Sequence, residues 1–311
     1  MNIAIQQLQG DEMLEAVFAL GQYSFHPSPP FQDKEEWLAA ARQRRGVTCF
    51  GALEESRPMT VAASTSMTQN IRGRLYPAAG VWGVSTHPSA RRKGYCRQTL
   101  ARLLSAEREA GKVFSSLYPF RESFYQRLGY VTYPQTKIAR FSPQALAPLL
   151  RLDLEGEVEF KLISEAYETY RAFLVEILPQ RHGMSLFEFG DLASAARNRF
   201  WAALARFDGV VEGVMLYSLK GEEITKFNFA AARFYYQTSR ARCLLLSWIA
   251  RHIDQAERAE LRLPAGETPE TWLEDLQVKI ESAFPTPMGR VLDVEQMGGM
   301  CVGAGSFTAQ I

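Results

Sequence analysis

The run VWGVSTHPSARRKGYCRQTLARLL, residues 81–104, constrains this chain more than any other segment. Its apolar start, ending at Thr86, predicts a strand. The apolar periodicity after Gly94 predicts an amphipathic helix that ends near Gly111. The basic loop between them leads directly into a helix start, where unpaired backbone N–H groups suit a pyrophosphate. The same residues also fit a solvated basic loop before a surface helix, so their surroundings must decide.

The rest of the first half predicts a mixed α/β domain. A helix is expected from Asp11, and a second begins at Asp33, where Asp33 and Glu36 form an acidic variant of the capping box. A polar turn, EESRP, predicts a hairpin. The expected strands are 2–8, 47–53, 59–67, 79–86, 113–117 and 131–140, with a short helix at 122–128 before the last one.

The second half repeats this order weakly, which predicts a second domain of related architecture. Asp208-Gly209 is a hairpin signal. Strands are expected over 158–163, 210–219, 224–230 and 259–263, and helices over 165–177, 186–205 and 234–253. No glycine precedes the last helix, and Phe234, Tyr235 and Tyr236 would obstruct a phosphate there.

Composition excludes several classes of protein. The 311 residues carry 35 basic and 34 acidic side chains, a balance that argues against a nucleic-acid binder. No apolar run approaches the roughly 20 residues that span a bilayer. The N-terminus lacks the pattern of a signal peptide, which favours a cytoplasmic protein. The 4 cysteines and 4 histidines are scattered, so we expect no metal.

The basic loop resembles the cofactor loop of the GNAT acetyltransferase superfamily, Gln/Arg-x-x-Gly-x-Gly/Ala. Arg91, Gly94 and Cys96 stand at the three signature positions, although Cys96 departs from glycine or alanine. A nearer resemblance, through YPFRESFYQRLGY at 118–130, is to the enhanced intracellular survival acetyltransferases.

That resemblance implies an α/β (α+β) fold of tandem GNAT-like mixed-sheet domains, the second one degenerate, followed by a sterol-carrier-like domain. The expected domains are 1–150, which binds acetyl-CoA, 151–284, which lacks the cofactor loop, and 285–311, which resembles only the start of the third domain.

The resemblance also implies which residues serve an N-acetyltransferase that uses acetyl-CoA as co-substrate. The backbone at Val84, Ser85 and Thr86 is expected to hold the pantetheine arm. The expected pyrophosphate cradle is Arg91, Arg92, Lys93, Gly94, Tyr95 and Cys96, with Phe120 and Arg121 as further cofactor contacts. Tyr125 matches the family's general acid. Its spacing from Phe124 and Leu128 equally fits a core aromatic.

The acceptor implied is a primary amine, on a small molecule or a lysine. Expected acceptor-side residues are Tyr23, Phe25, His26 and Trp37. Glu35 and Glu36 would attract a cationic amine or stabilise a helix start. In the resembled family the C-terminal carboxylate takes the amine proton, a role not assigned to Ile311. Homo-oligomers are expected by analogy. A non-catalytic acyl-CoA sensor and a lipid carrier are the alternatives.

Overall fold

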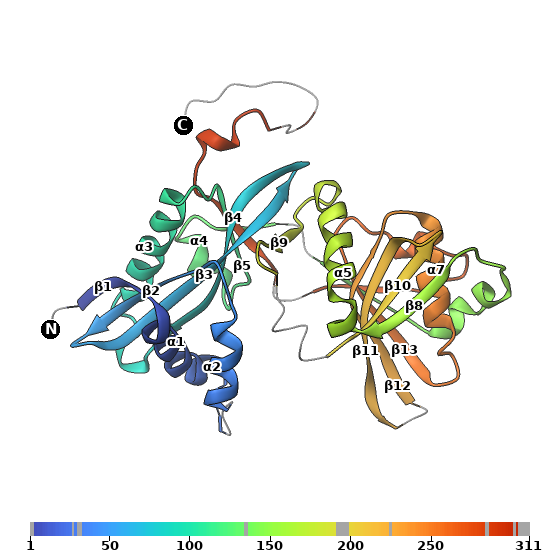
Figure 1. The fold of residues 1–311 in the computed structure, drawn as a ribbon, viewed down its shortest axis with the longest axis horizontal. Coiled ribbons are helices and arrows are strands. Elements are labelled where there is room, and N and C mark those ends of the chain that lie inside the picture. Colours follow the sequence, from blue (N-terminus) through green and yellow to red (C-terminus); the bar gives the residue numbers. More distant parts are fainter. Residues whose placement is uncertain are drawn as a thin grey trace. The chain divides into compact units, whose positions relative to one another are not determined.

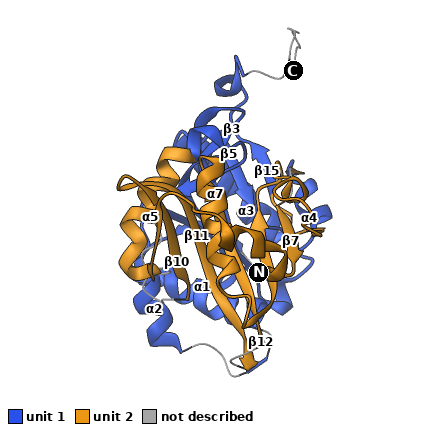
Figure 2. Ribbon diagram, turned by 90° about the vertical axis from the view of Figure 1, so that its right-hand side faces the viewer, with its two compact units in different colours: residues 1–131, 178–189, 288–311 blue, residues 132–177, 190–287 orange. Residues whose placement is uncertain are grey.

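The computed structural model describes residues 3–26, 28–29, 33–133, 136–190, 199–223, 226–283, 286–300 and 303. The chain forms two compact units (Figure 2). Unit 1 comprises residues 1–131, 178–189 and 288–311, and unit 2 comprises residues 132–177 and 190–287. None of the described helices has the length and apolar composition that crossing a bilayer requires.

A mixed sheet forms the centre of unit 1 (Figure 1). Its strands, in spatial order, are β1 (Ile3–Leu8), β2 (Val47–Glu54), β3 (Arg57–Ile71), β4 (Arg74–Thr86), β5 (Phe114–Leu117), β15 (Met288–Val291) and β6 (Val131–Thr132), with β9 (Ser185–Phe187) against β3. The register is antiparallel from β1 to β4, and β4 and β5 run parallel.

Helices cover both faces of this sheet. On one face, α1 (Gly10–Phe25) packs against Val61 and Ala63 of β3, and α2 (Lys34–Arg42) packs on α1. On the other, α3 (Tyr95–Glu109) and α4 (Glu122–Gln126) share a core with Ala62. Neighbouring residues of β3 thus serve opposite cores, as strand alternation requires.

Unit 2 repeats the arrangement. Its sheet, in spatial order, contains β8 (Glu157–Leu162), β10 (Trp201–Phe207), β11 (Val210–Glu223), β12 (Lys226–Tyr236), β13 (Ala256–Leu263), β7 (Lys137–Phe141) and β14 (Lys279–Ser282). The α-helices among its described residues are α5 (Ile163–Ile177) and α7 (Ser239–Ala250). Strands β12 and β13 are parallel and joined through α7, as β4 and β5 are joined through α3.

The two halves of the chain exchange a strand. β7 follows the first half in sequence but lies between β13 and β14 in unit 2. β15 follows the second half but lies between β5 and β6 in unit 1. The predicted divisions at residues 150 and 284 stay predictions, as does the third domain over 285–311. Residues 304–311 lie outside the described residues.

The predicted hairpins and helix cap are confirmed. Glu55 and Ser56 have φ of 48° and 67°, and Asp208 and Gly209 have φ of 50° and 81°, the left-handed values that tight hairpin turns need. The Asp33 carboxylate accepts a hydrogen bond from the Glu36 N–H at 2.8 Å.

Two predicted helices are wrong in part. Residues 186–187 and 201–205 belong to strands β9 and β10. The run WAALARF has helix-favouring residues, but burial in the sheet overrides that preference. The helix expected from Phe234 begins at Ser239, because β12 continues to Tyr236 and Phe234 within it is 1% exposed in the unit 2 core.

Candidate active site

The junction between β4 and α3 is a turn with two left-handed residues. After β4 come a 3₁₀ turn (Pro88–Ala90) and the basic residues 91–93. Arg92 has φ of 65°, and Gly94, the N-cap of α3, has φ of 82°. Because Gly94 has no side chain, the N-cap residue itself does not hydrogen-bond to the first N–H groups of α3 through a side chain. The first N–H groups of α3 therefore remain available to a ligand.

This turn is open to an anion. Arg91, Arg92, Lys93 and Gly94 are all exposed. A Cβ built at Gly94 would meet only the Gln98 amide nitrogen, at 3.8 Å, so a ligand atom has room beside the backbone. The turn combines backbone N–H groups, the positive end of the α3 dipole and three exposed cationic side chains, which is the chemistry that binds a phosphate.

Cys96, the residue that departs from the resembled loop, packs inward. Its side chain is half-buried against the core cluster that contains Leu100 and Tyr125. Burial raises the pKa of the Cys96 thiol to about 11, and a hydrogen bond from Thr86 opposes that rise in pKa. The side chain thus occupies core space and leaves the exposed side of the turn clear.

Strands β4 and β5 diverge before this turn. Their parallel pairing ends with Gly80 opposite Ser116, whereas β4 continues along β3 until Thr86 lies opposite Thr60. A bulge interrupts that second register near Gly83, whose φ is 63°. Residues 84–86 therefore extend past the β4–β5 ladder, where their backbone can pair with an extended ligand.

Ser85 has an unusual side chain in this stretch. It is 3% exposed, and its Oγ is one of the buried polar atoms that make no hydrogen bond within the described residues. A buried hydroxyl without a partner costs on the order of 1–3 kcal/mol.

Tyr125, on α4, is buried among aromatic rings. Its side chain is 4% exposed, and its ring lies 5.0 Å from Phe124, 5.9 Å from Phe120 and 5.9 Å from Tyr130. Burial, with smaller contributions from nearby Cys96 and Tyr130, raises the pKa of Tyr125 above its usual range. Phe120 is 69% exposed, and Arg121 is the exposed N-cap of α4.

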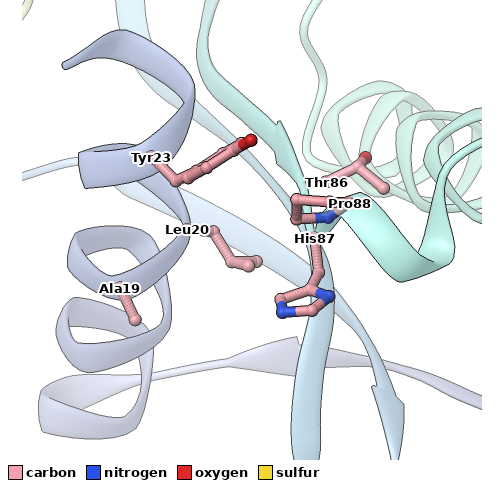
Figure 3. A pocket seen from close by; sticks show the side chains of 6 residues that line it. All are labelled: Ala19, Leu20, Tyr23, Thr86, His87 and Pro88. Carbon is pink, nitrogen blue, oxygen red and sulfur yellow. The ribbon is translucent and has the colours of Figure 1, made fainter. Parts of the chain in front are cut away.

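A cavity of about 280 Å³ lies between the last turns of α1 and the end of β4 (Figure 3). Its lining residues are Ala19, Leu20, Tyr23, Thr86, His87 and Pro88. The Arg91 guanidinium stands 5.6 Å above the Tyr23 ring. The cavity therefore joins the predicted acceptor side to the predicted cofactor loop. His87 was not predicted from the sequence as a lining residue, although it directly follows the strand that ends at Thr86.

The other expected acceptor-side residues lie apart from the lining of this cavity. Phe25 is 57% exposed at the end of α1, and His26 follows it as the C-cap. Trp37 packs on Phe18 with ring centroids 5.3 Å apart, so it contributes to the contact between α1 and α2.

The matching junction of unit 2 is filled by the chain itself. The Tyr236 hydroxyl, at the end of β12, donates to the Glu267 carboxylate, and the Trp272 ring lies 5.6 Å from Phe234. The Arg242 guanidinium stands 5.4 Å from the Tyr236 ring and 5.6 Å from Trp272. The Thr238 hydroxyl caps α7 by accepting from the Ala241 N–H. That this junction holds no cofactor stays a prediction.

Across the described ranges, no three His, Cys, Asp or Glu side chains gather into a group that could hold a metal ion.

The comparisons with known proteins agree with this geometry. Residues 5–132 match the family model of the acetyltransferase (GNAT) domain. The matched range contains the β4–α3 junction and Tyr125. No curated protein matches the chain.

Solved structures match nearly the whole chain. A probable N-acyltransferase from Enterococcus faecalis V583 is 18% identical, with a TM-score of 0.78, over 96% of this chain and 75% of that one. Eis1 from Mycobacterium abscessus is 17% identical, with a TM-score of 0.74, over 95% and 75%. A tandem GNAT protein from the clavulanic acid biosynthesis pathway is 12% identical, with a TM-score of 0.50, over 94% and 99%. At these identities the similarity establishes the fold, and the predicted tandem GNAT fold with two mixed sheets is confirmed.

Proposed function

We propose that this protein is an N-acetyltransferase that moves the acetyl group of acetyl-CoA to a primary amine. One observation carries the proposal. The β4–α3 turn, inside the matched GNAT domain, presents exposed amides and cations around a glycine with open space beside it. A diphosphate is the ligand that such a helix start favours.

The cofactor is assigned along this path. Residues 91–96 bind the pyrophosphate, with the cations adding charge-assisted hydrogen bonds. The backbone of Val84, Ser85 and Thr86 pairs with the pantetheine arm and directs the thioester towards the divergence of β4 and β5. Phe120 and Arg121 are proposed as outer contacts, which their exposure permits.

The reaction is direct transfer. The amine nitrogen attacks the thioester carbonyl, the C–N bond forms and the C–S bond breaks. Strand N–H groups stabilise the developing oxyanion. Tyr125 protonates the departing thiolate, and the nitrogen loses its proton to a base that we leave unassigned. Holding the amine and the thioester together supplies most of the acceleration.

The acceptor is a small-molecule amine or a lysine side chain. Tyr23 and the cavity beside it are proposed to receive the acceptor, and Phe25, His26 and Trp37 are proposed around its approach. The cavity lining is largely apolar, with Thr86 and His87 as its polar members. Asp33 is the observed N-cap of α2, which supports a helix-start role for Glu35 and Glu36 rather than amine binding.

The burial of Tyr125 favours one alternative, a non-catalytic acyl-CoA sensor. A tyrosine that is 4% exposed and packed among three rings also serves as an ordinary core residue. Such a protein would bind coenzyme A tightly and transfer no acetyl group.

The resemblance to the enhanced intracellular survival acetyltransferases supports two further proposals, a sterol-carrier-like third domain beginning near residue 285 and a homo-oligomeric assembly. The cytoplasmic location stays a prediction. The lipid-carrier alternative would require sterol or fatty-acyl binding.

An amine screen tests the proposal. Thiol release from acetyl-CoA is followed on adding each of a panel of primary amines, with wild type and Tyr125→Phe. We expect amine-dependent release by wild type and a loss of about 10²-fold in the variant, the usual contribution of a positioned acid. Tight coenzyme A binding without release for any amine would favour the sensor. Full turnover in Tyr125→Phe would remove that residue from the mechanism.

A further inference from the structure

Strand β15 brings a charged side chain beside the helix that carries Tyr125. The strand pairs with β5, so that Arg290 lies opposite Ser115 and Gly289 lies opposite Ser116. Met288, at the start of the strand, is fully buried in the same core cluster as Tyr125 and Tyr130. A strand from the end of the chain is therefore part of the core beneath α4.

Arg290 holds the C-terminal end of α4. Its Nη1 donates a hydrogen bond to the Leu128 carbonyl oxygen at 2.6 Å. Its side chain also lies along Gly129, where a Cβ would come within 3.6 Å of Nε and 3.7 Å of Cδ. Gly129 has φ of 78°, a conformation that glycine adopts without strain. The Arg290 side chain thus lies beside this turn, within ordinary contact distance of a Cβ built at Gly129.

The segment held by Arg290 is tied to Tyr125 by short contacts. The Leu128 N–H donates to the Tyr125 carbonyl at 2.9 Å, and the Tyr130 N–H donates to the same oxygen at 3.2 Å. The Tyr130 hydroxyl is hydrogen-bonded to Ser115 at 2.6 Å, and its ring meets the edge of the Tyr125 ring at 5.9 Å. Residues 128–130 thus connect Arg290 to the Tyr125 backbone and ring.

We propose that Arg290 is a positioning residue for the transfer reaction. By fixing the turn at Leu128 and Gly129, it fixes the direction of the Tyr125 ring and hydroxyl. This inference rests on the proposed function, because it assumes that Tyr125 acts on the departing thiolate. It adds that the geometry of the acid depends on a strand far away in sequence.

A double-mutant cycle tests the proposal. Arg290→Met keeps the length of the side chain but removes the donor and the charge. It is compared with wild type, with Tyr125→Phe and with the double variant. Arg102→Met, an exposed site on α3, is the matched control. For each protein, kcat and KM for thiol release and the Kd for coenzyme A are measured.

We expect Arg290→Met to lower kcat about tenfold or more while the Kd for coenzyme A changes less than twofold. In the Tyr125→Phe background the same change should have almost no further effect on kcat, since residues acting as a unit are not additive. Arg102→Met should resemble wild type. An unchanged kcat, or an equal loss in both backgrounds, would overturn the role of Arg290.

Arg290→Lys covers the case in which the Met variant does not fold. Lysine keeps a charge and a donor but loses the planar fork that lies along Gly129. We expect a kcat loss of at least threefold that again disappears in the Tyr125→Phe background. An unchanged kcat, or an equal loss in both backgrounds, would again contradict the positioning role. Absence of thiol release by wild type would instead refute the proposed function, and the positioning role with it.

Discussion

Burial raises the pKa of Tyr125 and so keeps its hydroxyl protonated. Its pKa is raised because the ionised ring would lose its hydration in the core of unit 1. A raised pKa means that the neutral hydroxyl persists to higher pH than in a free tyrosine. The residue is thereby kept in the protonated form that a general acid requires.

We therefore predict a turnover profile without an alkaline decline from Tyr125. With an acceptor amine that is fully neutral by pH 8, kcat should stay level to about pH 10, where an ordinary tyrosine is half ionised. The measurement is kcat for thiol release across this range, with Tyr125→Phe as the control. A decline between about pH 9 and pH 10 that disappears in the variant would contradict the raised pKa of Tyr125.

Single residues of the cofactor loop were predictable because their chemistry is local. The amphipathic periodicity predicts that the helix begins near Gly94, and Gly94 is the N-cap of α3 with φ of 82°. The Ser85 hydroxyl, which makes no hydrogen bond within the described residues, could not be predicted from local sequence, because its surroundings depend on what neighbouring elements cover.

At the scale of elements, the sequence predicts the turns better than it predicts which strands pair with one another. The EESRP and Asp-Gly turns specify hairpins through their own backbone preferences. The destination of β15 was not visible, because an exchanged strand has the same alternation as one that stays in its own half. The sequence also mispredicts β10 for this reason: its alanine-rich run favours a helix locally, and its strand structure depends on the sheet that buries it.

The exchanged strand supports a stability prediction. Met288 is fully buried beside Tyr130, so Met288→Ala should destabilise unit 1 by about 2–5 kcal/mol. Val291, at the exposed end of the same strand, is the control and should cost less than about 1 kcal/mol as alanine. Hydrogen exchange of peptides from β5 and α4 measures the effect. Loss of protection confined to peptides of unit 2 would refute the exchange.

At the scale of the molecule, the internal echo in the sequence predicted two related domains, and the two units repeat one order of strands. What distinguishes them is how each uses its parallel strand pair. Unit 1 leaves exposed amides and cations after β4, whereas unit 2 fills its junction with Tyr236, Trp272 and Glu267. The natural acceptor could not be predicted, because an acceptor cavity depends on side chains from several elements.

This difference predicts one coenzyme A per chain. Calorimetric titration of wild type should reach saturation at a single site, because the Tyr236–Glu267 hydrogen bond and the Trp272 ring occupy the second junction. Disrupting that closure with Trp272→Ala should leave the stoichiometry at one, since the junction has a threonine cap and no glycine turn. Two equivalents bound by wild type would show that unit 2 retains a cofactor site.

The most direct measurement compares Gly94→Trp with Gly111→Trp at the opposite end of α3. Both glycines have left-handed φ, 82° and 83°, so both variants carry similar backbone strain, on the order of 1–2 kcal/mol. Neither site crowds a Cβ: Gly94 meets only Gln98 at 3.8 Å, and Gly111 meets nothing within 4 Å. We expect coenzyme A to bind at least about tenfold more weakly to Gly94→Trp than to wild type, a loss of about 1.4 kcal/mol in binding free energy. We expect Gly111→Trp to bind coenzyme A as wild type does. Equal and undiminished binding by both variants would contradict a diphosphate site at the start of α3.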